Sequence, residues 1–143
     1  TGGAAVFDND ETIRAALGVR GLVVVGLSGR VSRPSYRVSA YMAEQGYEVT
    51  GVNPRETCIF GRPAYPSLDR VPRPIELINV FREPGALPGL LPEILASGAR
   101  FLWLQLGVVD HDVARRVQDA GIDVVMDRCI AVEHRRRLGA ARR

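Results

Sequence analysis

Residues 21–30 read GLVVVGLSGR, an unbroken apolar run that ends at Gly26 and passes into a turn of glycine and serine. A short run rich in β-branched residues is typical of a central parallel strand buried on both faces. Residues 35–46 then repeat apolar side chains at helical spacing, with Pro34 just before them and Gly46 at their end. The order strand, glycine turn, helix predicts an α/β fold.

The rest of the chain repeats this alternation of strand and helix. Further strands are predicted at 47–53, 75–81, 101–106 and 122–126, and helices at 10–17, 84–97, 110–120 and 131–138. Residues 54–74 are rich in proline and arginine and predict a long connection with a short turn at 67–69. Right-handed crossovers then predict a Rossmann-like, doubly wound sheet of five mainly parallel strands in the order 3-2-1-4-5, with helices on both faces.

Length and composition predict a single domain over residues 1–143, made of an N-terminal helix at 8–18, a core at 21–134 and a basic tail at 135–143. With 46% hydrophobic and 24% charged residues, the composition is that of a globular protein. No apolar run approaches the roughly 20 residues of a membrane span, so no membrane partner is expected. Two cysteines make no disulfide framework, and no secretory leader precedes the first helix, which favours a cytoplasmic location.

The net charge of +3 is unevenly placed. Residues 134–143 hold five arginines and no acid, so the chain without them carries −2. We expect this tail to be solvated rather than to bind nucleic acid. All 19 basic residues are arginine, which excludes lysine chemistry such as Schiff-base formation.

The turn after the first strand is a candidate anion site. Gly26 and Gly29 let the backbone approach a ligand closely, and the following helix start presents free N–H groups. A full dinucleotide fingerprint would have glycine where Ser28 and Val31 stand, so an ordinary turn is the alternative. Residues 28–37 are also rich in hydroxyl and guanidinium groups, which suit a phosphate. These are Ser28, Arg30, Ser32, Arg33, Ser35 and Arg37.

The ends of the second and third strands add to this site. The second strand ends in Asn53-Pro54-Arg55, with a cation where an NAD-binding domain usually places an acid. Arginine there suits a phosphorylated ribose, as in NADP or CoA, with a plain surface arginine as the alternative. Val80-Phe81-Arg82 ends the third strand, where Phe81 suits an adenine or pantetheine group or is simply core.

Few residues suggest catalysis. His111 is predicted in the first turn of a surface helix and His134 in the basic tail, and the two histidines and two cysteines have no metal-binding spacing. Cys129 follows the last strand beside Arg128, close to Glu133 and His134. It is the one candidate for a reactive thiol, against the alternative of a structural thiol.

These stretches together resemble the stand-alone CoA-binding domain family, which is related to the CoA-binding domain of succinyl-CoA synthetase alpha subunits. The resemblance runs in order from about Gly21 to His134. The matching segments are residues 25–28 (VGLS), 33–38 (RPSYRV), 52–55 (VNPR), 65–68 (YPSL), 80–82 (VFR), 103–108 (WLQLGV) and 125–129 (VMDRC) with Glu133-His134.

The resemblance implies that the 26–30 loop cradles the phosphates of coenzyme A, that Arg55 meets the phosphorylated ribose and that residues 80–82 line the adenine or pantetheine path. The synthetases have lysine at the position of Arg55 and carry a phosphohistidine on a separate domain, for which this chain shows no counterpart. The candidate cofactor-binding residues are Gly26, Leu27, Ser28, Gly29, Arg30, Arg33, Ser35, Arg37, Asn53, Pro54, Arg55, Val80, Phe81, Arg82 and Gln105.

The leading hypothesis is therefore a non-catalytic module that binds CoA or acyl-CoA. Two alternatives stay open: an NADP-binding oxidoreductase or redox sensor, and thiol chemistry with CoA through Cys129. The sequence does not define the acyl group, the oligomeric state or a protein partner.

Overall fold

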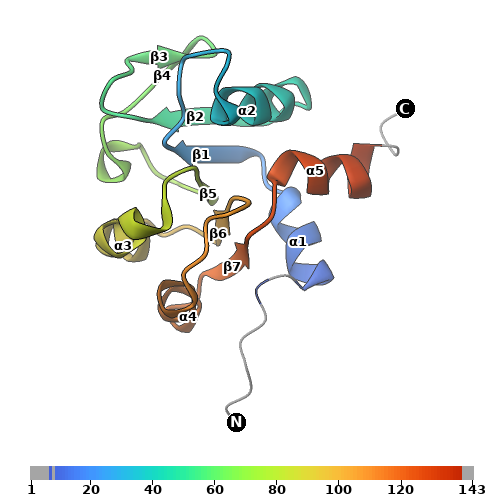
Figure 1. The fold of residues 1–143 in the computed structure, drawn as a ribbon, viewed down its shortest axis with the longest axis vertical. Coiled ribbons are helices and arrows are strands. Elements are labelled where there is room, and N and C mark those ends of the chain that lie inside the picture. Colours follow the sequence, from blue (N-terminus) through green and yellow to red (C-terminus); the bar gives the residue numbers. More distant parts are fainter. Residues whose placement is uncertain (1–6, 8, 140–143) are drawn as a thin grey trace.

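The computed structural model describes residue 7 and residues 9–139 as an α/β domain with one five-stranded parallel sheet between two layers of helices (Figure 1). Residue 8 and residues 140–143, which belong to the predicted N-terminal helix and basic tail, lie outside the described residues. The strands of the sheet are β1 (Gly21–Val25), β2 (Glu48–Val52), β5 (Leu77–Val80), β6 (Phe101–Leu104) and β7 (Asp123–Met126). The helices are α1 (Asp10–Leu17), α2 (Pro34–Glu44), α3 (Leu87–Ala96), α4 (His111–Asp119) and α5 (Ile130–His134).

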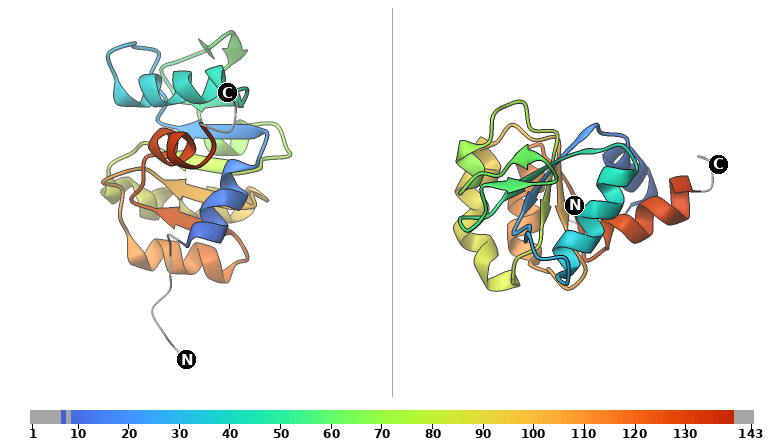
Figure 2. Two further views of the ribbon diagram at one scale, coloured as in Figure 1. Left: turned by 90° about the vertical axis from the view of Figure 1, so that its right-hand side faces the viewer. Right: turned by 90° about the horizontal axis from the view of Figure 1, so that it is seen from above.

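The apolar run of β1 forms the centre of the sheet, as predicted. Side chains of Val23 and Val25 join the core on one face, and those of Leu22 and Val24 join the core on the other. A strand buried on both faces reads as a continuous apolar run because neither face alternates with polar residues. Helices α3 and α4 cover the first face, and α1, α2 and α5 cover the second (Figure 2).

The predicted Rossmann-like α/β class is confirmed, but the predicted strand order 3-2-1-4-5 is wrong. The order is β2-β1-β5-β6-β7, so the third long strand lies against β1 and not outside β2. The outer edge of β2 is already paired with Tyr65 of the connection, whose N–H donates to the Gly51 carbonyl and whose carbonyl accepts from the Asn53 N–H. A right-handed return past β1 must also cross the face opposite α2. The connection does so, since Leu68 and Val71 pack in the α3–α4 core.

The long connection contains more structure than its sequence suggested. A two-stranded hairpin, β3 (Cys58–Ile59) and β4 (Arg62–Pro63), turns through Phe60 and Gly61, both at positive φ, and the short helix η1 (Leu68–Arg70) follows. The other short turns are η2 (Pro84–Ala86), which precedes α3, and a π-helical turn η3 (Arg135–Gly139), which continues α5. Phe60 stacks on Tyr36 of α2 with ring centroids 4.9 Å apart, which ties the hairpin to the start of that helix.

The prediction for the C-terminal residues is partly wrong. His134 is fully buried, with its Nδ1 2.8 Å from the Tyr41 hydroxyl oxygen, and Arg137 forms ion pairs with Asp10 and Glu133. The prediction of a solvated tail is therefore wrong for His134 and Arg137. Among the described residues, no helix has the length and apolar character that crossing a bilayer requires.

Candidate functional site

The ends of β1, β2 and β5 meet at one edge of the sheet, where helices on opposite faces leave a crevice beside β1. With the strand order β2-β1-β5, the crevice between β1 and β5 is the place where open α/β sheets bind ligands. Gly26 follows β1 there with φ of +89°, and a Cβ on it would lie 2.5 Å from the carbonyl oxygen of Phe81. Only glycine allows these two strand ends to come so close.

In the loop after Gly26, three backbone N–H groups donate hydrogen bonds to side-chain oxygen atoms. The N–H of Ser28 donates to Oγ of Ser35 at 3.0 Å, and the N–H of Arg30 donates to Oγ of Ser28 at 3.0 Å. The N–H of Gly29 donates to Oε2 of Glu56 at 3.0 Å. Helix α2 then begins with Pro34 in its first turn and has no side-chain cap. In the loop that the sequence predicts as an anion site, these three donors therefore bond to side chains of the protein itself.

Asn53 fixes the turn that follows β2. Its Nδ2 donates to the carbonyl of Leu27 at 3.0 Å, which links the ends of β1 and β2, and its Oδ1 accepts from the N–H of Arg55 at 2.9 Å. An asparagine that bonds the backbone two residues further on makes an Asx turn. The turn brings Arg55 and Glu56 back over the β1 loop, so Asn53 positions the site with both ends of its amide.

Two adjoining hollows lie over these strand ends. The glycine-loop hollow has a volume of about 600 Å³ and is lined by Gly26, Ser28, Arg30, Arg33, Pro34, Ser35, Asn53, Arg55, Glu56 and Phe81. The α3 hollow has a volume of about 720 Å³ and extends to Pro66, Leu68, Leu90 and Glu93. They share Gly26, Arg33, Asn53, Arg55 and Phe81, and each is within the usual size of a small-molecule site.

Three arginines of the glycine-loop hollow are free cations. Across residue 7 and residues 9–139, the side chains of Arg30, Arg33 and Arg55 form neither an ion pair nor a hydrogen bond, and all three are exposed. Guanidinium groups match phosphate oxygens in geometry and charge, and three around one hollow favour a polyanionic ligand.

Arg82 differs from these three because it has an acidic neighbour. Its Nη2 lies 3.4 Å from Oε1 of Glu83, and both side chains line the α3 hollow. A hydrogen bond from its own backbone N–H and the Arg82 guanidinium lower the pKa of the Glu83 carboxyl, which therefore stays ionised near neutral pH. A ligand phosphate at Arg82 has to compete with this carboxylate.

Ten of the fifteen predicted binding residues line the two hollows, and five do not. Those in the lining are Gly26, Ser28, Arg30, Arg33, Ser35, Asn53, Pro54, Arg55, Phe81 and Arg82. Among the other five, Leu27 and Val80 are fully buried core residues, and Gly29 lies beside the hollow with its N–H on Glu56.

Arg37 and Gln105 have local structural contacts. Arg37 is exposed on α2, and its Nη1 donates to the carbonyl of Ser32 at 3.0 Å. Gln105 is buried at the end of β6, and its Oε1 accepts from the N–H of Ile130 at 3.0 Å, which holds the start of α5. A ligand contact by either residue stays a prediction.

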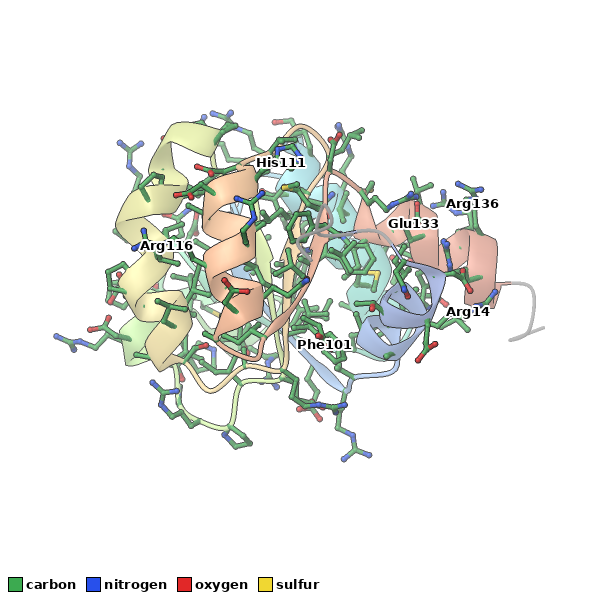
Figure 3. All side chains as sticks on the ribbon, turned by 90° about the horizontal axis from the view of Figure 1, so that it is seen from below. Arg14, Phe101, His111, Arg116, Glu133 and Arg136 are labelled. Atoms are coloured by element: carbon green, nitrogen blue, oxygen red, sulfur yellow. The ribbon has the colours of Figure 1, made fainter. Side chains whose placement is uncertain are left out.

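The thiol candidate lies away from the hollows. Cys129 is half-buried just before α5, packs against the core on the α2 face and is absent from the residues that line either hollow; Cys58 is exposed on β3. His111 is exposed at the start of α4, as predicted, 6.2 Å from the Phe7 ring (Figure 3). Within the described part of the chain, no group of three histidine, cysteine or acidic side chains is placed to hold a metal ion.

Glu56 is the residue that the sequence analysis missed. It lines the glycine-loop hollow and contacts Gly29, although it lies 27 residues away in the chain. The available signal was Asn-Pro after a strand, because the turn it makes reverses the chain toward the neighbouring strand end.

Comparison with known proteins gives consistent matches. Residues 20–135 match the family model described as CoA binding domain. The YneT protein of Bacillus subtilis (strain 168) is 40% identical over 113 residues, which cover 79% of this chain and 84% of that protein. The structure of the cell-free ID.343 protein from Thermus thermophilus superposes with a TM-score of 0.85 at 41% identity, covering 90% of this chain and 98% of that chain. A hypothetical protein from Pyrococcus horikoshii OT3 gives a TM-score of 0.86 at 32% identity over 92% and 93% of the two chains.

Proposed function

This chain belongs to the family of CoA-binding domains, and we propose that it binds coenzyme A or an acyl-CoA in the two hollows at the ends of β1, β2 and β5. The observation that carries the proposal is that Arg30, Arg33 and Arg55 all line the glycine-loop hollow and, among the described residues, have no ion-pair or hydrogen-bond partner for their side chains. CoA carries a pyrophosphate and a ribose phosphate, and such a polyanion meets charge-assisted donors on these three side chains.

The two hollows suit the two chemical halves of this ligand. In the proposal Arg30 and Arg33, with the Ser28 and Ser35 hydroxyls, hold the pyrophosphate, and Arg55 meets the phosphorylated ribose. The α3 hollow receives the less polar pantetheine arm, because Pro66, Leu68 and Leu90 line it together with Phe81. Its glutamates can accept hydrogen bonds from the amide N–H groups of that arm.

We further propose that the module binds without catalysing a reaction. The residues that line the two hollows include no histidine and no cysteine, the groups that most often act as bases or nucleophiles. Apart from Glu56, Glu83 and Glu93, the polar lining consists mainly of arginine, serine and backbone donors, which bind and orient a phosphate but do not transfer protons at neutral pH.

Calorimetric titration of the purified chain under reducing conditions tests this proposal. Wild-type protein is expected to bind CoA and acetyl-CoA in the micromolar range, and Arg55→Ala to weaken that binding about tenfold through the loss of one charge-assisted contact. Arg115→Ala is the matched control, because Arg115 is an exposed arginine on α4 outside both hollows, and it should bind like wild type.

Two results would contradict the proposal. Saturable binding of NADPH without binding of either CoA species would make the site an NADP site, for which Arg55 is also suited. Equal weakening by Arg55→Ala and Arg115→Ala would show that general charge, rather than the glycine-loop hollow, attracts the ligand.

A further inference from the structure

Glu56 lies where the glycine loop would hold an anion. Its Oε2 accepts from the N–H of Gly29 at 3.0 Å, and a Cβ on residue 29 would stand 2.7 Å from Oε1 and 3.0 Å from Oε2. The carboxylate therefore occupies the space that the missing side chain of Gly29 leaves open. A glycine at this position allows close approach of an anion, and here that anion belongs to the protein.

The carboxylate bonds to the backbone although free cations line the same hollow. Arg30, Arg33 and Arg55 all line it with Glu56, yet among the described residues none of them forms an ion pair with it. In this structure the carboxylate has the loop N–H, rather than an arginine, as its partner.

The three side chains that accept from the loop N–H groups differ in chemistry. The hydroxyls of Ser28 and Ser35 are donors as well as acceptors, so they can turn and donate to a phosphate. The ionised carboxylate of Glu56 can only accept and carries a negative charge. A phosphate at the N–H of Gly29 can coexist with the serines but not with Glu56.

Resting on the proposed function, we propose that Glu56 is an internal substitute for a ligand phosphate: it holds the N–H of Gly29 in the empty protein and is displaced when CoA binds. The exchange needs only rotation of the Glu56 side chain, since the turn backbone is fixed by Asn53, whose carbonyl accepts from the N–H of Glu56 at 3.1 Å. Glu56 then lowers the affinity for every ligand that places an anion at the loop, and sets how tightly CoA is held.

Glu56→Gln is the sharpest variant because it keeps the shape and an acceptor oxygen but removes the charge. Removing one unit of like charge near a phosphate is expected to tighten binding about fivefold. Glu76→Gln is the matched control. Glu76 is also half-buried and accepts a backbone N–H, that of Gly21 at 2.9 Å, but it lines neither hollow.

The experiment titrates CoA and, separately, inorganic pyrophosphate into wild type, Glu56→Gln and Glu76→Gln. We expect tighter binding of both probes to Glu56→Gln alone. Equal Kd values for CoA in wild type and Glu56→Gln, or the same gain in both glutamine variants, would overturn the role of Glu56 and leave CoA binding intact. If CoA binds to none of the three, the proposed function falls, and pyrophosphate then decides on Glu56: tighter binding to Glu56→Gln supports displacement, and equal or absent binding overturns it.

The amide resonance of Gly29 reports the displacement directly. It should differ between wild type and Glu56→Gln without ligand, because the acceptor differs in charge. At saturation with CoA the two resonances should coincide, since the same phosphate has replaced both side chains. A difference that persists at saturation would show that Glu56 stays on the loop.

Discussion

Two groups of arginines in this molecule have opposite surroundings. Arg30, Arg33 and Arg55 line a hollow at the strand ends and, within the described residues, have no acidic partner. Arg136 and Arg137, near the C-terminus, lie beside Glu133, and Arg137 also pairs with Asp10 of α1. Figure 3 shows this second group from below, with Glu133 and Arg136 on the C-terminal helical segment and Arg14 on the adjacent α1.

The difference separates arginines that stabilise the fold from arginines that can bind a ligand. Glu133 is 5% exposed and lies within 4.0 Å of Arg128, Arg136 and Arg137, so its charge is matched inside the protein. Arg135 adds a cation–π contact, with its guanidinium 4.9 Å from the Tyr41 ring centroid. The Glu133 carboxylate thus has its partners within the protein, whereas the arginines of the glycine-loop hollow have no acidic partner among the described residues and can pair only with water or a ligand.

The largest effect on stability is expected from a variant that removes the ion pairs of Glu133. Glu133→Ala should lower the free energy of unfolding by about 3 kcal/mol, because it leaves Arg137, 15% exposed, without its buried carboxylate. The Kd for CoA should not change, since Glu133 lines neither hollow. Denaturant unfolding and calorimetric titration measure the two quantities.

Arg136→Ala is the control for that variant. Its side chain is 68% exposed and its contact with Glu133 is 4.0 Å, so its removal should cost less than about 0.5 kcal/mol. Similar losses from both variants would mean that the cluster is not held by the buried carboxylate.

The arginines of the glycine-loop hollow are expected to show the opposite pattern, in which their loss weakens CoA binding and leaves stability unchanged. The double variant Arg33→Ala with Arg55→Ala should weaken CoA binding about a hundredfold, since two charge-assisted contacts are lost. The free energy of unfolding should stay within about 0.5 kcal/mol of wild type, because neither side chain has a partner among the described residues. A marked loss of stability in chemical denaturation would place these arginines with the structural group instead.

The sequence predicted the arginines that line the hollows better than the paired arginines near the C-terminus. The glycine turn, the serine- and arginine-rich loop and Asn53-Pro54-Arg55 were predictable as a site because the ends of parallel strands meet at one edge of a sheet. Ten predicted residues do line the hollows. Leu27 was assigned to the site by its place after a strand, and Val80 and Gln105 through segments that resemble the family, but neither ground fixes whether a side chain points into the core.

The other side depends on contacts between residues distant in sequence. Glu133 reads as one acid beside a basic run, and only the packing of α5 against α2 and of η3 near Asp10 turns that run into a paired cluster. The strand order was predicted wrongly for the same reason. Alternation of elements defines the class, but the side on which β5 returns is decided by the pairing of Tyr65 with the edge of β2. Glu56 likewise becomes a site residue only through a turn that brings it to Gly29.

The smallest predicted effect concerns the exposed end of the paired group. Hydrogen bonds from Arg14 and then Arg137 lower the pKa of Asp10 below its ordinary value. A carboxyl whose pKa is lower in the folded chain stabilises the fold above its unfolded pKa, about 3.9, and loses that contribution as the pH falls through the folded value. Asp10→Asn should therefore lower Tm slightly near neutral pH, and the gap to wild type should close as the pH falls through the lowered pKa of folded Asp10.

Asp112→Asn separates this ion pairing from the dipole of the helix. Asp112 is an exposed acid in the first turn of α4 and, among the described residues, has no ion-pair partner. Both variants remove an acid from a helix start, where the dipole favours negative charge. Added salt should shrink the Tm gap of Asp10→Asn more than that of Asp112→Asn, because a pair with two arginines is added to the dipole. Equal gaps with equal salt dependence would mean that Asp10 acts through its helix alone, and that the paired group ends at the buried Glu133.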